Sequence, residues 1–318
     1  MKKISIIGTG LSAIFSAIHL RKNTDLEINL FDKARGLGGR LATRRAEDGK
    51  FDHGAQYFSI ERISNLPEIQ MLINEGIISN IEDKDIYFSP DGMTNIAKKL
   101  LMDFNIFKEH KLVSIDKENE NYKLFFENGS TFNSDYIIMS CPMPQSLEIL
   151  NKSKIDFDNN LIKALEDLNY FPCIVVMIKS EIKLSNLDKH IGTDVDSKNI
   201  SWIGDNYRKK VSSIENYYTI QCSPEFSYEN FENEYDETNE KLKHDMEKIF
   251  GSNYQILSNH KWRYSIPKNF YQEDNSLVIN EKDFLGLCGD IFTNGRFDGA
   301  ITSGLSIADK FLKNELQK

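Results

Sequence analysis

The chain has 318 residues, 40% of them hydrophobic and 27% charged, which suits a globular protein large enough for two domains. Acidic residues (48) outnumber lysine and arginine (39), and the net charge of −9 argues against nonspecific binding to nucleic acid or anionic membranes.

Two further features limit the class of protein. The N-terminal Met1-Lys2-Lys3 precedes apolar residues as in a secretory signal, but Gly8 interrupts the run, and no stretch reaches the roughly 18 apolar residues of a membrane span. The four cysteines lie far apart without C-x-x-C spacing, which predicts reduced thiols and no metal centre. We therefore expect a cytoplasmic protein without a transmembrane helix.

The first predicted element is a strand that leads into a glycine turn and a helix. Lys3–Ile7 is rich in isoleucine, as in a buried parallel strand, and a G-x-G-x-x-A pattern follows it. Gly8 permits the turn, Gly10 lets a pyrophosphate approach the backbone, and Ala13 allows close helix packing. The helix N-terminus favours an anion. The predicted phosphate contacts are Gly8, Gly10, Leu11, Ser12 and Ala13.

A second strand, Leu26–Phe31, ends at an acidic residue. Asp32 lies about 20 residues beyond the glycines, where a carboxylate binds the ribose of an adenine dinucleotide. The order strand, turn, helix, strand and acid favours dinucleotide binding over the alternative, a βαβ unit that binds no ligand.

A basic, glycine-rich loop comes next. Residues 35–45 contain three glycines and four arginines, which suits a loop around an anionic cofactor, since guanidinium groups and backbone N–H groups bind phosphate. Flavoproteins that bind FAD in an extended conformation often carry such a Gly-Gly-Arg sequence after the acidic residue. The alternative is a solvated basic loop. The candidate cofactor contacts are Lys33, Gly39 and Arg40.

Phe51–Phe58 is the third candidate segment. Gly54 and Ala55 would let the chain pass close to a flat ring, and the amide of Gln56 can donate a hydrogen bond to it. Tyr57 and Phe58 are candidate walls for the isoalloxazine or a substrate ring, or alternatively core aromatics. His53 is interpreted as structural.

The middle of the chain predicts a helix and three strands, followed by a second, strand-rich domain. A helix is predicted from Pro90 to about Phe104, and strands at His110–Asp116, Tyr122–Phe126 and Tyr136–Ser140. Further predicted strands are Pro172–Lys179, Ile200–Gly204, Tyr217–Cys222 and Gln255–Tyr264, with an acidic surface helix at Tyr228–Phe250.

These elements predict an α/β fold: a Rossmann-like FAD-binding domain with a second, mixed-sheet substrate domain. We assign residues 1–58, 90–150 and 283–318 to a discontinuous FAD-binding domain. Residues 59–89 and 151–282 are assigned to the substrate domain.

A strand, a Gly-Asp pair and a helix close the chain. The apolar segment Phe284–Cys288 precedes Gly289 and Asp290, and a helix with a small-residue face begins at about Gly299. Its N-terminus would favour negative charge on the flavin pyrimidine edge, and Asp290 would bind a ribityl hydroxyl or a phosphate-bound water. The predicted contacts are Gly289, Asp290, Arg296, Phe297 and Ala300.

These motifs together resemble the renalase-like branch of the FAD-dependent amine oxidase superfamily. The resemblance rests on Gly8–Ala13, Arg35–Arg45, Phe51–Phe58, His260–Ser265, and Cys288–Asp290 with Gly295–Ala300. Asp32 stands where the branch usually has Glu, and Ala13 replaces the third glycine. The resemblance implies a glutathione-reductase-like FAD domain, with the backbone near Val113 at the adenine. No cysteine lies in an obvious tethering motif, so FAD is expected to be noncovalent.

The resemblance also implies a reaction: oxidation of isomeric dihydropyridine forms of NAD(P)H to NAD(P)+, with oxygen reduced to hydrogen peroxide. Such a donor becomes aromatic when it gives a hydride to flavin N5, so no side-chain base is required and no catalytic side chain is assigned. Two alternatives remain, an amine oxidase or desaturase of the same superfamily and a non-catalytic FAD-binding protein. The candidate substrate contacts are Tyr57, Trp202, Trp262, Arg263 and Tyr264.

Overall fold

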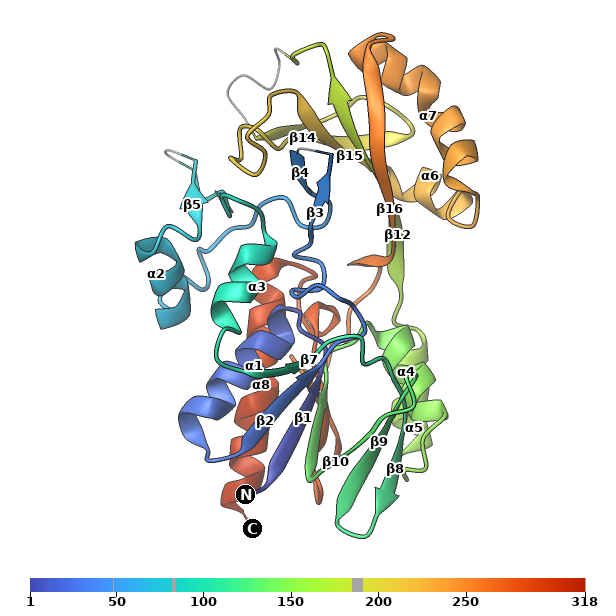
Figure 1. Cartoon of the computed structure of the whole chain (residues 1–318). Coiled ribbons are helices and arrows are strands. Elements are labelled where there is room, and N and C mark those ends of the chain that lie inside the picture. Colours follow the sequence, from blue (N-terminus) through green and yellow to red (C-terminus); the bar gives the residue numbers. More distant parts are fainter. Residues whose placement is uncertain (48, 82–83, 185–190, 318) are drawn as a thin grey trace. The chain divides into compact units, whose positions relative to one another are not determined.

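The computed structural model describes residues 1–47, 49–81, 84–184 and 191–317 (Figure 1). The chain forms two compact units. Unit 1 comprises Met1–Gly39, Ala97–Asn169 and Pro267–Lys318, and unit 2 comprises Arg40–Ile96 and Tyr170–Ile266. Relative to the division expected from the sequence, residues 40–58 and 90–96 group with unit 2, and residues 151–169 and 267–282 group with unit 1.

Unit 1 contains the predicted Rossmann-like sheet. Its six strands lie in the order β17-β18-β11-β1-β2-β7, and all neighbours are parallel except the edge strand β17. Ile4 and Ile6 of β1 are fully buried at its centre. The strands are β1 (Lys3–Ile7), β2 (Glu27–Phe31), β7 (Asn105–Phe107), β11 (Tyr136–Met139), β17 (Leu277–Asn280) and β18 (Leu285–Leu287).

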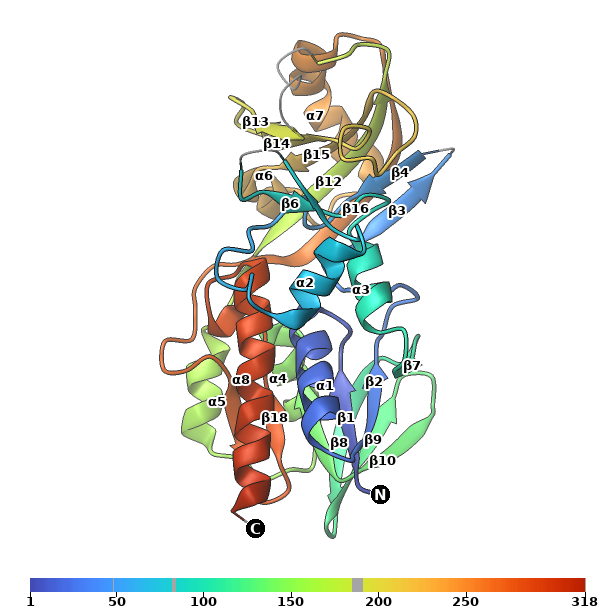
Figure 2. The ribbon, with the colours of Figure 1, turned by 90° about the vertical axis from the view of Figure 1, so that its left-hand side faces the viewer.

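Helices α1 (Leu11–Asn23) and α8 (Phe297–Leu316) lie side by side across this sheet (Figure 2). A Cβ added to Gly304 of α8 would lie 2.3 Å from the Ser12 carbonyl oxygen of α1, so the two backbones touch at this point. The small-residue face predicted for the C-terminal helix is therefore a helix–helix contact.

A three-stranded sheet also belongs to unit 1 and packs against β2. The ring of Phe31, the last residue of β2, stacks on Phe126 with the ring centroids 4.8 Å apart. The sheet consists of β8 (Leu112–Glu118), β9 (Asn121–Phe126) and β10 (Thr131–Ser134). The remaining elements of the unit are α4 (Met143–Asn151), α5 (Asn159–Glu166) and the short 3-10 helix η2 (Asp290–Phe292).

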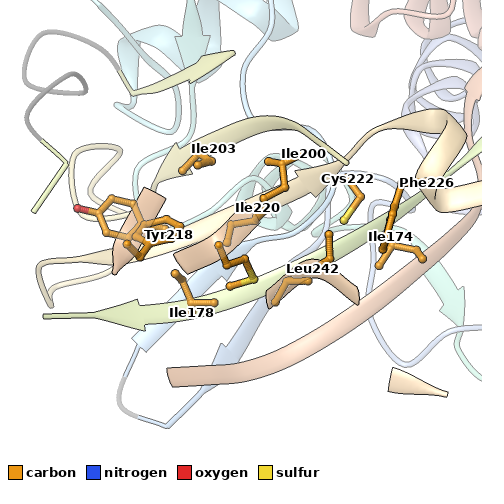
Figure 3. Close-up of a cluster of buried hydrophobic side chains, with 12 residues drawn as sticks. Ile174, Ile178, Ile200, Ile203, Tyr218, Ile220, Cys222, Phe226 and Leu242 are labelled. Carbon is orange, nitrogen blue, oxygen red and sulfur yellow. The ribbon is translucent and has the colours of Figure 1, made fainter. Parts of the chain in front are cut away.

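Unit 2 is built on a five-stranded sheet in the order β13-β14-β15-β12-β16. Alternate residues of β12, including Ile174 and Ile178, face Leu242 and other side chains of α7 (Tyr235–Phe250) in one buried cluster (Figure 3). The strands are β12 (Tyr170–Ser180), β13 (Gly192–Asp194), β14 (Ile200–Asp205), β15 (Tyr217–Cys222) and β16 (Tyr254–Pro267).

The other face of this sheet carries a hairpin. Met177 of β12 and Tyr217 of β15 pack against Phe51 in a second buried cluster, so the hairpin that contains Phe51 belongs to unit 2. The hairpin is β3 (Thr43–Ala46) with β4 (Gly49–Asp52). The unit also contains α2 (Pro67–Asn74), β5 (Ser79–Asn80), β6 (Tyr87–Phe88), α6 (Pro224–Glu229) and α7 (Tyr235–Phe250).

Two predicted helices were too long. Helix α3 (Thr94–Leu100) begins late because Asp91 and Gly92 have φ values of +65° and +112°, which a right-handed helix cannot contain. The single helix predicted at Tyr228–Phe250 is interrupted between α6 and α7. There the Lys261 ammonium hydrogen-bonds the carbonyls of Phe231 and Asn233.

Among the described residues, no helix combines the length and apolarity needed to cross a membrane.

Candidate functional site

The glycine turn after β1 leaves the start of α1 open. Gly8 has φ +111° and donates its N–H to the Phe31 carbonyl at 2.7 Å. Gly10 is the N-cap of α1, and no side chain caps it. A Cβ added to Gly10 would meet no atom of the described residues within 4 Å. The first turn of α1, which contains Leu11, Ser12 and Ala13, therefore leaves backbone N–H groups and space that suit a phosphate.

The carboxylate of Asp32 is held at the end of β2 by this same turn. One oxygen accepts hydrogen bonds from the Thr9 N–H at 3.0 Å and from the Thr9 hydroxyl, and the other accepts from the Ala34 N–H at 2.8 Å. Asp32 is buried, whereas its neighbour Lys33 is exposed. Thr9 was not predicted as a site residue from the sequence, although its hydroxyl donates to Asp32, the residue predicted to bind the ribose.

The second glycine loop begins beside the first. The Gly38 N–H donates to the Thr9 carbonyl at 3.1 Å, and a Cβ on Gly39, which has φ +56°, would lie 3.5 Å from Gly10 Cα. The arginines of this segment have protein partners. Arg35 forms an exposed salt bridge with Glu109, and Arg40, in unit 2, donates to the Ser265 carbonyl at 2.8 Å.

The C-terminal motif follows the carboxyl end of β18 in the unit 1 sheet. The Gly289 N–H donates to the Ser303 hydroxyl at 2.9 Å, and Asp290 is buried at the start of η2. Arg296 is the exposed N-cap of α8, again without a side-chain cap. The first turns of α8 contain the half-buried Phe297 and the buried Ala300.

Val113 lies where the pairing of β8 with β9 shifts register, between Leu112 and Ser114. A residue at such an irregularity is left out of the regular ladder, so its backbone is suited to contact a ligand.

In unit 2, the segment after β4 is packed so tightly that Gly54 is required. A Cβ on Gly54 would lie 1.9 Å from the Arg40 carbonyl oxygen, and the Ala55 N–H donates to that same oxygen at 2.9 Å. Tyr57 is 47% exposed, whereas Phe58 is buried and pairs with Tyr87 through two backbone hydrogen bonds. Phe58 is thus a core aromatic, and Tyr57 alone of the pair presents its ring.

Trp202 is fixed beside Tyr57. The two ring centroids lie 6.3 Å apart, and the indole packs against Gly192 and Gly204, where any Cβ would overlap the ring. Trp202 is buried, and the two glycines leave the space that its indole occupies.

A buried ion pair that sequence reasoning missed lies beneath this segment. The Lys209 ammonium contacts an Asp52 oxygen at 3.1 Å and the Gln56 side-chain oxygen at 2.7 Å. Lys209 and Asp52 are both 0% exposed. Burial lowers the pKa of Lys209, and the Asp52 carboxylate opposes this effect. The sequence around Lys209-Lys210 is typical of an exposed turn, and no local pattern indicates that Lys209 pairs with Asp52.

An aromatic cluster joins β4 to β16. The Trp262 indole N–H donates to the His53 carbonyl at 2.6 Å, and the two rings stack 5.5 Å apart. Tyr264 meets the edge of Tyr170. Arg263 does not join them, because neighbouring residues of a strand face opposite sides, and it pairs instead with Glu232 at 2.8 Å.

His53 and His260 lie in this cluster and are held neutral. Burial, with His260 and Arg44, lowers the pKa of His53 to about 3, and burial with Arg44 lowers the pKa of His260 to about 4. Both values lie below the ordinary 6.5, so the stability that these groups contribute is full above pH 6.5 and is lost as the pH falls toward 4.

We therefore expect His260→Gln to flatten the acid side of the stability profile. Between pH 7.5 and pH 4.5, the free energy of unfolding of the variant should fall by about 1 to 2 kcal/mol less than that of the wild type. Thermal unfolding across this range measures the difference. His244→Gln, at an exposed position on α7, is the control. Parallel profiles for H260Q and the wild type would contradict the assignment.

The described residues contain no cluster of three or more His, Cys, Asp or Glu side chains suited to a metal ion. All four cysteines are free, and burial raises the pKa of Cys141 and Cys173 to about 12, which disfavours the reactive thiolate.

Comparison with known proteins shows which families the chain resembles. Residues 6–75 match the NAD(P)-binding Rossmann-like domain, and residues 66–312 match the flavin containing amine oxidoreductase model. Renalase of Mus musculus is 23% identical over 96% of this chain and 98% of its own length.

Solved structures share the fold at low sequence identity. A structure from an Exiguobacterium species, provisionally named a protoporphyrinogen oxidase, has a TM-score of 0.73 at 13% identity, covering 100% of this chain and 99% of its own. A double mutant of putrescine oxidase has a TM-score of 0.69 at 11% identity, covering 98% of this chain and 99% of its own.

Proposed function

This chain belongs to the family of flavin containing amine oxidoreductases, and on that premise we propose a specific reaction for it. The chain is an FAD-dependent oxidoreductase. The proposed substrates are isomeric dihydropyridine forms of NAD(P)H, which react with oxygen and a proton to give NAD(P)+ and hydrogen peroxide. The observation that carries the proposal is the similarity to mouse renalase over nearly the full length of both chains.

The residues of unit 1 fit the adenosine and pyrophosphate parts of FAD. Gly10 leaves space at an uncapped helix N-terminus, and Asp32 is fixed after β2 with both oxygens oriented by backbone N–H groups. The proposed contacts in this unit are Gly8, Gly10, Leu11, Ser12, Ala13, Asp32, Lys33, Gly39, Val113, Gly289, Asp290, Arg296, Phe297 and Ala300.

In unit 2 the proposed cofactor contacts are Arg40 and the segment Gly54–Tyr57, whereas Phe58 is left out because it is buried and its backbone pairs with Tyr87. Within this segment, the main chain from Gly54 to Gln56 is the part suited to contact the cofactor. The side-chain amide of Gln56 is already used, because its nitrogen donates to the carbonyls of Asp52 and Gly54. FAD is proposed to be noncovalent, since all four cysteines are buried or half-buried thiols outside these segments.

The exposed ring of Tyr57 is suited to contact a planar pyridine ring, and the buried indole of Trp202 lies behind it with the ring centroids 6.3 Å apart. Trp262 and Tyr264 are the further proposed substrate residues. Bound FAD supplies the two-electron acceptor for the reaction, with N5 as the position that takes the hydride. The role of these side chains is to orient the ring and exclude water.

An anaerobic mixing experiment tests the proposal. The purified yellow protein is mixed with dihydropyridine isomers of NAD made with borohydride. The absorbance of the flavin is followed at about 450 nm, a wavelength that the cofactor sets. We expect rapid bleaching, reversed by air with release of peroxide. Ordinary NADH is the control and should bleach the flavin far more slowly. Persistent colour with the isomers, but bleaching by amines, would assign the chain to the amine oxidases instead.

A further inference from the structure

The buried ion pair in unit 2 has no part in the chemistry proposed above, yet it occupies a central position in the unit. Lys209 lies in the loop after β14, and Asp52 is the last residue of β4, 157 positions earlier in the chain. A fully buried lysine is rare and costs several kcal/mol of desolvation unless it is paired.

Asp52 has every hydrogen-bonding group in use. One carboxylate oxygen accepts from the Thr43 hydroxyl at 2.6 Å and the Met93 N–H at 2.9 Å, and the other faces Lys209. Its N–H donates to the Asn206 side chain, and its carbonyl accepts from Thr219 at 2.8 Å. The end of β4 therefore cannot shift without breaking several buried hydrogen bonds.

Gln56 is oriented by the same lysine. Its side-chain oxygen accepts from the Lys209 ammonium, so its nitrogen must point the other way, where it donates to the Asp52 carbonyl at 2.7 Å and the Gly54 carbonyl at 3.1 Å. The two ends of the turn from Asp52 to Gln56 are thus connected through one ammonium group.

We propose that Lys209 is a positioning residue of the reaction, which acts through Gln56 to hold residues 52–57 in the one conformation that contacts the flavin ring. This inference rests on the proposed function, in which Gly54–Tyr57 contacts the cofactor. Gln56 is then a residue that shapes the turn, and the main chain of the turn and the Tyr57 ring are the groups that meet the ligands.

The test compares three variants with the wild-type holoprotein. Gln56→Met removes the amide while both charges stay paired, and the carbonyls of Asp52 and Gly54 keep their donors Thr219 and Gln221. Lys209→Met with Asp52→Asn removes both charges together, so no unpaired ion is left in the core. Lys210→Met makes the same substitution at an exposed neighbour and is the matched control.

The deciding measurement is the visible circular dichroism of bound FAD, which reports the geometry around the flavin ring and does not depend on the substrate. We expect Q56M and K209M/D52N to change this spectrum in the same way and to slow anaerobic flavin reduction at least tenfold. The triple variant K209M/D52N/Q56M should be no slower than K209M/D52N, since both changes act through one turn. K210M should match the wild type.

A wild-type flavin spectrum in Q56M and K209M/D52N would overturn the proposal, whatever the reaction rate. So would independent effects that add in the triple variant, because Lys209 would then act by a route that does not include Gln56. If K209M/D52N does not fold, Q56M decides alone. Failure of dihydropyridines to reduce the wild type would reject the proposed substrate and leave the spectral test unaffected.

Discussion

Gly10→Val is expected to remove FAD from the protein while the apoprotein keeps its fold. Gly10 has φ −73°, which valine can adopt, and a Cβ there would meet no described atom within 4 Å. The added methyl groups would instead occupy the space over the uncapped N-terminus of α1, where a phosphate is proposed to bind. We expect affinity for FAD to fall by about 100-fold, equivalent to about 3 kcal/mol. FAD titration of the apoprotein measures this loss.

Gly8→Val gives the informative contrast. Gly8 has φ +111°, and its Cβ would lie 2.4 Å from the Ser140 hydroxyl, so this variant should lose stability as well as FAD. Thermal unfolding of the two apoproteins separates the cases, with G10V close to the wild type and G8V well below it. Normal FAD affinity in G10V would reject the phosphate site.

Gly304→Val is expected to destabilise unit 1 by about 3 kcal/mol or more, the upper range for forcing extra atoms into a packed contact. The Cβ would lie 2.3 Å from the Ser12 carbonyl oxygen and 2.9 Å from Ser12 Cα, and backbone atoms cannot rotate away. Helices α1 and α8 would have to separate. Denaturant unfolding of the apoprotein measures the loss.

Thr302→Val on the same helix is the matched control, because its side chain is exposed and the substitution keeps the β-branched shape. We expect T302V to unfold within about 0.5 kcal/mol of the wild type, as surface substitutions usually do. If G304V were as stable as T302V, the close contact between α1 and α8 would not exist.

Local patterns predicted the first βαβ unit well because its constraints lie close together in sequence. Gly8, Gly10 and Asp32 follow from a turn and two short strands, and each lies in unit 1 as the motif requires. Strands β12, β14, β15 and β16 of unit 2 were also predicted within a few residues, since β-branched and aromatic runs mark them, whereas the shorter strands of that unit were not predicted.

Residues whose environment depends on distant segments could not be predicted in this way. Lys209 resembles a surface lysine until the fold brings Asp52 to it. At the break between α6 and α7, the carbonyls of Phe231 and Asn233 accept hydrogen bonds from Lys261, which lies on β16 and could not be assigned to them from the sequence. Arg263 was predicted as a substrate contact, whereas in the structure it alternates with Trp262 and Tyr264 along β16 and pairs with Glu232.

The division of the chain into interleaved segments has a consequence for its synthesis. The polypeptide passes between the two units four times, at residues 39–40, 96–97, 169–170 and 266–267. The sheet of unit 1 needs β18 beside β11, and α1 needs α8, so that sheet cannot close until the last segment has left the ribosome. Unit 2 ends at Ile266, so all of its residues are synthesised before the last segment of unit 1, and it can fold first. A nascent chain stalled before residue 285 would lack β18, so the apolar edge of β11 would be unpaired and prone to aggregate.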